Sequence, residues 1–274
     1  MKRKYITVFL VFFLSANICW GGHDKADHGA RSAALAGADV ALSGFWSLRN
    51  NQAGLASLKN PTGGIFYENR FGMKELGYQS AGFIYPFQGS ALGVTVNYFG
   101  DQLYHESAFG LAYGMKIAEG FSAGIQLDYF SSFTDTEKQV KNNAVTFEAG
   151  LLYELNSEIT IGVHAYNPLE IMMNSSAATE IIPANYSLGA AFRVDEKLLL
   201  TTEVEKTQGF GESVRAGVEY EVVDKTFLRA GVATNPGLFS FGFETSWNHL
   251  TLQLASSMHE VLGFSPMVSV LYEF

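Results

Sequence analysis

The feature that most constrains the fold is an alternation of apolar with small or polar residues, which recurs from about residue 63 to the end of the chain. In the last such segment, 264–274, Val268 and Val270 share one face and Ser269 and Glu273 share the other. Successive side chains of a strand point to opposite faces, so the alternation predicts strands with one apolar side. We count about 14 such segments of roughly nine to twelve residues, the length that a tilted strand needs to cross a membrane.

Two architectures accommodate such strands: a soluble sandwich of two sheets, and a barrel whose apolar face contacts lipid. The lengths of the connections distinguish the two architectures, because every second connection is very short and the others are mostly longer. The short connections are 87–89, 118–120, 156–158, 195–197, 223–225 and 247–249, and the longest of the others are 131–143 and 167–184. Outer-membrane barrels have short periplasmic turns and longer extracellular loops. We therefore predict an all-β fold, a transmembrane antiparallel β-barrel of about 14 strands, in residues 62–274.

A secretory signal peptide is predicted for residues 1–21. Basic residues at 2–4 precede an apolar run at 6–14 and then small residues, which is the pattern of such a leader. The apolar run is shorter than the roughly 20 residues of a spanning helix. Cys19 is the only cysteine and lies within the leader, and the residues before it lack the pattern expected ahead of a lipidated cysteine. The exported chain is therefore expected to hold no disulfide and no thiolate metal site.

The composition narrows the possible surroundings and partners. Only 16% of the residues are charged and 47% are hydrophobic, which is poor in charge for a soluble protein. The net charge of −9 becomes −12 once the three basic residues of the leader are removed, which argues against nucleic acid as a partner. No other apolar run is long enough for a spanning helix. Because lipid tolerates only helices and closed sheets, a membrane location requires a barrel.

Residues 22–61 do not alternate, and we predict that they form a small amino-terminal plug. Two stretches resemble the plug of the FadL-like outer-membrane family: GARSAALAGADVAL at 29–42 and NNQAGLA at 50–56. That family includes fatty-acid transporters and the PorV and PorQ proteins of type IX secretion. The chain departs from the family pattern at Ala36, where Gly is common, and at Gln52, where Pro is common. The resemblance implies a plugged barrel in the bacterial outer membrane, surrounded by its lipids.

The carboxy-terminal strand carries a second, partial resemblance. It ends in Tyr272-Glu273-Phe274, which is similar to the terminal strand that the barrel assembly machinery reads in outer-membrane proteins. Met267 and Ser269 depart from the polar residue and the Gly that are usual in that signal. The barrel assembly machinery is therefore an expected partner.

No motif of the chain predicts catalysis. Residues 120–124 match G-x-S-x-G, but that motif needs a strand-to-helix elbow and Ser122 stands at the start of an alternating strand. His164 and His249 have no local acid or Ser spacing to support a hydrolase, so an outer-membrane lipid hydrolase is the remote alternative. There is no P-loop, dinucleotide or zinc-ligand motif. We predict neither enzyme activity, nor a cofactor, nor a bound metal.

Charged residues recur on the inward face of the predicted strands. They either guide a solute through a polar lumen or hold the plug by ion pairs, and we favour the second interpretation because buried charges need partners. The residues predicted to take part are Arg31, Asp39 and Arg49 of the plug, and Glu148, Arg193, Arg215 and Arg229 of the barrel.

The connection at 167–184 begins with an unusually apolar stretch. Its residues Leu169, Ile171, Met172 and Met173 are predicted either to contact a hydrophobic ligand or partner protein, or to pack over the barrel mouth.

Two functions remain open. The resemblance implies either passage of hydrophobic small molecules across the outer membrane, or a non-conducting accessory barrel of the PorV/PorQ type in type IX secretion or surface anchoring. The partners would be a hydrophobic small molecule in the first case and secretion-system proteins in the second.

Overall fold

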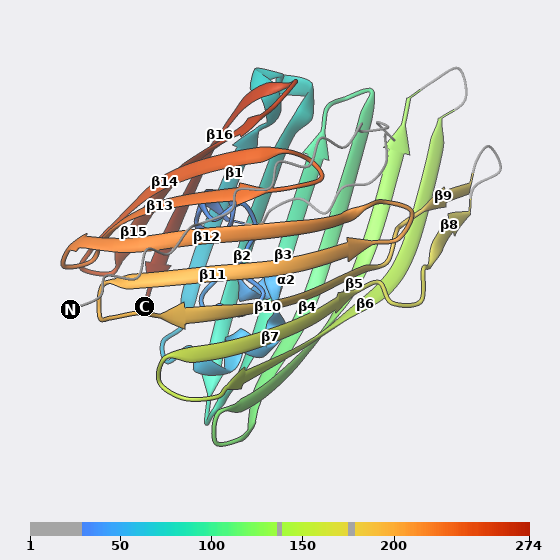
Figure 1. Cartoon of the computed structure of the whole chain (residues 1–274). Coiled ribbons are helices and arrows are strands. Elements are labelled where there is room, and N and C mark those ends of the chain that lie inside the picture. Colours follow the sequence, from blue (N-terminus) through green and yellow to red (C-terminus); the bar gives the residue numbers. More distant parts are fainter. Residues whose placement is uncertain (1–28, 136–138, 175–178) are drawn as a thin grey trace, which may run out of the picture.

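Strands dominate the computed structural model, which describes residues 29–135, 139–174 and 179–274. The predicted signal peptide, residues 1–21, lies outside these residues. Within them, 14 strands form one closed antiparallel barrel, as predicted (Figure 1). The barrel strands are β1 (Thr62–Asn69), β2 (Gly77–Phe87), β3 (Ser90–Gly100), β4 (Tyr104–Ala118), β5 (Phe121–Thr134), β6 (Val140–Glu154), β7 (Ile159–Tyr166), β10 (Asn185–Arg193), β11 (Leu198–Thr207), β12 (Glu212–Val223), β13 (Thr226–Ala233), β14 (Leu238–Trp247), β15 (Leu250–His259) and β16 (Gly263–Glu273). β16 pairs with β1 and closes the barrel.

The alternation of the sequence appears as two faces of the barrel wall. In β5, Ile125 and Leu127 are each 58% exposed, whereas Gln126 between them is 1% exposed. The apolar side chains thus point outward, where a bilayer would cover them, and the polar and small ones point into the lumen.

The connections have different lengths at the two ends of the barrel. At one end they are 88–89, 119–120, 155–158, 194–197, 224–225 and 248–249. At the other they are mostly longer: 70–76 holds the 3-10 helices η2 (Arg70–Gly72) and η3 (Lys74–Leu76), and 167–184 holds a separate hairpin of β8 (Met172–Asn174) and β9 (Thr179–Ile181). The predicted alternation of turn lengths is confirmed, and we take the short-turn end as periplasmic.

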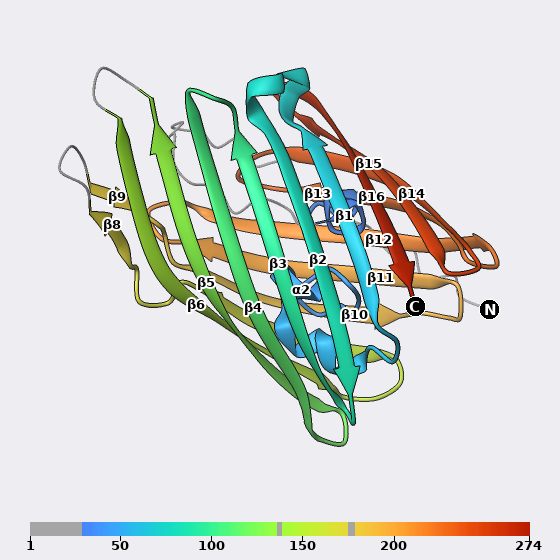
Figure 2. The same ribbon diagram turned by 180° about the vertical axis from the view of Figure 1, so that it is seen from behind.

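The plug lies inside the barrel, nearer the short-turn end, as both ribbon views show (Figures 1 and 2). It consists of α1 (Ala30–Ala34), α2 (Ser47–Asn50) and the 3-10 helix η1 (Gln52–Ser57), joined by loops. Among the described residues, no helix is long and apolar enough to span a membrane. Leu35, Leu48 and Leu55 of the plug have no exposed surface. The core of this protein is therefore the interface between the plug and the inner wall.

Inward glycines bring the plug backbone against that wall. A Cβ atom at Gly124 of β5 would lie 2.3 Å from the carbonyl carbon of Gln52, and one at Gly162 of β7 would lie 2.2 Å from the carbonyl oxygen of Val40. No other residue type fits such a close approach of two backbones. Small inward residues therefore make room for the plug.

Candidate functional site

The inner wall on the β5–β6 side holds two buried carboxylates against one plug arginine. Arg49 lies in α2, a single turn whose backbone bonds to Trp46 direct its side chain toward the wall. Its Nη1 lies 2.9 Å from Asp128 Oδ1 and 3.0 Å from Glu148 Oε1. The Arg49 side chain is 5% exposed and both carboxylates are 0% exposed. These ion pairs tie the plug to β5 and β6 in a site closed to water.

Three further polar side chains complete this group. Gln52 Nε2 donates to Glu148 Oε2 at 2.7 Å, and Gln52 Oε1 lies 3.2 Å from His164 Nε2. His164 Nε2 is also 3.0 Å from Glu148 Oε2. Gln126 Nε2 donates to both carboxylates, at 2.8 Å to Asp128 and 3.2 Å to Glu148. We call these residues the Arg49 cluster: Arg49, Gln52, Gln126, Asp128, Glu148 and His164.

The sequence did not predict the parts that Gln52, Gln126 and His164 play in this cluster. A proline at position 52, as is common in the resembling family, has no side-chain amide to donate to Glu148. The only signal for Gln126 and His164 was their place on the inward face of a predicted strand.

A second group of charges lies on the β12–β15 side of the lumen. Arg31 of α1 binds Glu219 of β12 through two nitrogens, at 2.9 and 3.1 Å. Arg229 binds the same Glu219 at 2.6 Å and reaches Glu244 at 2.9 Å, and Gln253 donates to Glu244 at 2.8 Å. We call these residues the Arg31 cluster: Arg31, Glu219, Arg229, Glu244 and Gln253. Its plug residue is less enclosed than Arg49, since the Arg31 side chain is 25% exposed.

Two barrel side chains hold the plug backbone between these clusters. Glu203 Oε2 accepts from the backbone N–H groups of Asp39, at 3.0 Å, and Val40, at 2.9 Å. Arg215 donates to the carbonyl oxygen of Gly37 at 3.3 Å and pairs with Glu205 of β11. The Asp39 carboxylate accepts a hydrogen bond from Asn50 within the plug. Asp39 therefore contacts the barrel through its backbone N–H group.

Arg193 is the predicted lumen residue that lies apart from the plug. It is the last residue of β10 at the short-turn end, and its side chain is exposed. Its backbone N–H donates to the backbone carbonyl oxygen of Glu158 at 2.7 Å, and within the described part of the chain its side chain forms no ion pair. The strand ends before this position can reach the plug interface.

The apolar stretch of the 167–184 connection divides into different environments. Leu169 is 68% exposed, whereas Ile171 packs against a buried group on the inner wall near the long-loop end. That group, the mouth cluster, consists of Phe130, Ala144, Tyr166 and Ile182, with Ala108 and Ile171 at its edge. The backbones of Met172 and Met173 pair with residues 181 and 180 in the β8–β9 hairpin.

Asn167 fixes both ends of this connection over the lumen. Its Nδ2 donates to the carbonyl oxygen of Ile182 at 2.6 Å, and its Oδ1 accepts from Thr146 at 2.6 Å and from the backbone N–H of Ile171 at 3.2 Å. The ring of Tyr166, the residue before it, lies 5.9 Å from the guanidinium of Arg49. The mouth cluster therefore adjoins the Arg49 cluster.

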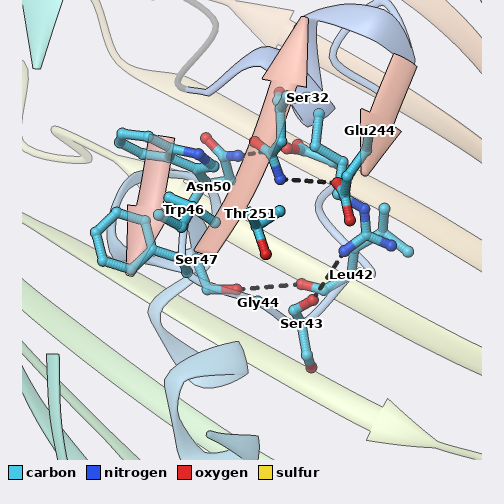
Figure 3. Close-up of a pocket in the computed structure, with 14 residues that line it drawn as sticks. Ser32, Leu42, Ser43, Gly44, Trp46, Ser47, Asn50, Glu244 and Thr251 are labelled. Carbon is cyan, nitrogen blue, oxygen red and sulfur yellow. Dashed lines mark hydrogen bonds between the residues drawn. The ribbon is translucent and has the colours of Figure 1, made fainter. Parts of the chain in front are cut away.

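A cavity of about 190 Å³ lies between part of the plug and the wall of β14–β16, beside the place where α1 packs on that wall (Figure 3). Its plug side is lined by residues of α1, by Asp39, by the loop 42–46 and by Ser47 and Asn50 of α2. Glu244, Thr251, Gln253 and Leu271 line its wall side. It lies toward the short-turn end, because Thr251 is two residues beyond the 248–249 turn. Ser43, on its rim, is exposed. We call this space the plug cavity.

The G-x-S-x-G match at 120–124 does not form a nucleophile elbow. Ser122 is the second residue of β5, and the chain continues as a strand rather than turning into a helix. Over the described ranges, no three His, Cys, Asp or Glu side chains lie close enough together to hold a metal ion.

Comparisons with protein-family models and with curated proteins found no match to the sequence. The fold, in contrast, matches solved structures. A FadL homologue of Pseudomonas aeruginosa superposes with a TM-score of 0.67 at 12% identity, covering 90% of this chain and 98% of that one. CymD, a monoaromatic hydrocarbon channel, gives 0.69 at 12% identity, covering 90% and 97%. TbuX, the toluene transporter of Ralstonia pickettii, gives 0.67 at 11% identity, covering 90% and 97%.

These structures share the barrel and differ from this chain at almost nine positions in ten, so the likeness is one of fold. They support the FadL-like resemblance and lend no support to the PorV/PorQ resemblance. The apolar outer surface matches the location of such barrels in the bacterial outer membrane. The chain has the fold of the FadL-type outer-membrane barrels.

Proposed function

We propose that the protein passes hydrophobic small molecules across the bacterial outer membrane. The observation that carries this proposal is a closed barrel whose lumen holds a plug with a cavity beside it. A barrel that served only as a surface anchor has no need for space at its plug. The solved structures with this fold include a monoaromatic hydrocarbon channel and a toluene transporter.

The long-loop end offers an apolar entry. Ile171 and Ile182 cover aromatic residues of the inner wall there, and Leu169 stands exposed beside them. An apolar solute arriving from outside would meet this surface first, and the burial of apolar area favours its transfer from water. The role of Leu169, Ile171, Met172 and Met173 in contacting a ligand is part of this proposal.

The test is uptake of radiolabelled toluene by intact cells of a Gram-negative host that lacks its own FadL-type channels. Expression of this protein should raise the initial uptake rate several-fold over cells that express an unrelated outer-membrane barrel in equal amount. Unchanged uptake, together with a stoichiometric protein partner in material purified from the native membrane, would favour the secretion accessory instead.

A further inference from the structure

The barrel wall is taller at β4–β6 than at β14–β15. β4 and β6 have 15 residues each and β5 has 14, whereas β14 and β15 have 10 each. With a rise of about 3.4 Å per residue and a tilt of roughly 40°, a strand of about ten residues already spans the apolar band of about 25 Å. β4, β5 and β6 lie side by side (Figure 2). Their outward residues near the short turns, such as Ile117 and Tyr153, are apolar or aromatic, so the extra length lies at the long-loop end.

The outward residues of these three strands change character toward the long-loop end. Phe109, Tyr129 and Val145 are register partners in an apolar outward row and are 48%, 47% and 59% exposed. Two further rows follow, whose residues alternate with buried ones such as Ser132 and Asn142 and therefore also face outward. We call these two rows the rim patch, and its residues are, with the row nearer the apolar one first, Ser107, Ser131, Asn143, His105, Phe133 and Lys141.

The rim patch lies directly above the lipid-facing band. Its rows stand two and four residues beyond Phe109, or roughly 5 and 10 Å farther from the bilayer centre. The headgroup layer adds about 5–8 Å to each side of the hydrocarbon core. Tyr129 Oη donates to Asn143 Oδ1 at 2.8 Å across this boundary, where tyrosines are common in membrane proteins. The rim patch therefore meets the headgroups of the outer leaflet, and its outer row reaches the surface of that layer.

The side chains of the rim patch favour an anionic, hydroxyl-rich partner. None of the six residues is acidic, in a chain whose net charge is −9. Lys141 is exposed, and within the described residues it forms no ion pair. An ammonium group binds phosphate as a point charge. The hydroxyls of Ser107 and Ser131 and the amide nitrogen of Asn143 can donate to the oxygens of a sugar.

Aromatic stacking orders the outer row of the rim patch. The His105 ring stacks between those of Tyr98 and Phe133, with ring centroids 5.5 and 5.0 Å apart. Side chains that are already fixed lose less entropy when a ligand binds.

The shorter wall differs from this arrangement. On β14–β16 the register partners Phe239, Met258 and Phe264 keep the outward face apolar up to the hairpin. The rim patch is therefore not a general property of the long-loop end.

We infer that the rim patch binds the phosphorylated sugar headgroup of a glycolipid in the outer leaflet. Lys141 contacts the phosphate, and Ser107, Ser131 and Asn143 contact the sugar. The acyl chains of the same lipid lie against the apolar row below. This inference does not depend on what the lumen passes.

The test is native mass spectrometry of the detergent-folded protein during titration with lipid A, an acylated diglucosamine with two phosphates. Lipid A should bind saturably. Removal of both phosphates should weaken the binding by about tenfold or more, because charge-assisted contacts are lost. Phosphatidylglycerol, which is anionic but has no sugar, should also bind about tenfold more weakly. Inorganic phosphate should not displace lipid A, since the partner is the whole headgroup.

A matched pair of variants locates the phosphate contact. Lys141→Glu should weaken the binding of lipid A by about tenfold or more, because it repels the phosphate. Lys74→Glu is the control, since Lys74 of η3 is an exposed lysine at the same end of the barrel but outside the rim patch. It should leave the affinity unchanged. Ser131→Leu combined with Asn143→Leu removes donors without changing the charge and should also weaken the binding. Heat-modified gel mobility checks that each variant folds.

Weaker binding in the two patch variants, with unchanged binding in Lys74→Glu, supports the site. Equal losses in Lys141→Glu and Lys74→Glu would overturn it, because any surface charge would then act alike. The absence of saturable binding, or equal affinity for lipid A and phosphatidylglycerol, would also contradict the inference. Full binding by the Ser131→Leu and Asn143→Leu double variant would rule out the sugar contact.

Discussion

The two sides of the plug are attached to the barrel in different ways. On the β4–β7 side, Arg49 faces two carboxylates in a group of side chains that is almost fully buried. On the β12–β16 side, Arg31 is a quarter exposed, its partner Glu219 has a second arginine, and a cavity adjoins the pair. The plug arginine is buried on the first side, whereas on the second side it is partly exposed and lines a cavity.

The two attachments should differ in how much stability is lost when the plug arginine is removed. Without Arg49, Asp128 and Glu148 would remain as buried carboxylates that keep only neutral amide donors and His164. Without Arg31, Glu219 would still bind Arg229. Removing one partner of a buried ion pair is far more destabilising than removing one partner of a pair that water reaches.

The largest expected effect tests this asymmetry. Arg49→Met should lower the free energy of unfolding by about 3–5 kcal/mol, whereas Arg31→Met should lower it by about 1 kcal/mol. Denaturant titration of the protein folded in lipid vesicles measures both. Equal losses would show that the two sides anchor the plug alike.

A control variant distinguishes two causes of the instability of Arg49→Met: the lost packing of the arginine, and the buried carboxylates left without a positive partner. In Arg49→Met combined with Asp128→Asn and Glu148→Gln, the buried charges are gone, so most of the lost stability should return. If the triple variant is as unstable as Arg49→Met alone, packing of the arginine rather than its charge holds the plug on this side.

A smaller loss of stability is expected from adding a methyl group where the plug backbone lies against the barrel wall. Gly124→Ala places a methyl group 2.3 Å from the plug backbone at Gln52, and should cost about 1–3 kcal/mol because neither backbone can yield freely. Gly63→Ala is the matched control, since its new methyl group would meet its nearest neighbours at an ordinary 3.7 Å. Thermal unfolding of the two variants in one detergent gives the comparison. A Gly124→Ala protein as stable as Gly63→Ala would mean that the plug is loosely seated against β5.

The smallest loss of stability is expected at the short-turn end of the barrel. Arg193→Ala should change the free energy of unfolding by less than about 0.5 kcal/mol, because the side chain is exposed and distant from the plug. The same denaturant titration detects it. A loss comparable to that of Arg31→Met would place Arg193 in the plug interface after all.

The sequence by itself determined the barrel wall. An alternation of period two is a local property, so reading Ile125, Gln126 and Leu127 in order shows which side chain faces lipid and which faces the lumen. Turn lengths are equally local, and they indicated the two ends of the barrel. The plug was visible as a stretch that breaks the alternation, with Arg31 and Arg49 as charges that needed partners.

The tertiary structure alone decided which partners these charges have. Gln52 meets His164 across 112 positions of sequence, and Arg31 meets Glu219 across 188. Inward residues on different strands look equivalent in the sequence, because the pattern gives the face of each side chain but not its height or its neighbours around the barrel. Strand register and barrel closure set those, so the two clusters of charges, and the cavity beside the Arg31 cluster, form only when the sheet closes.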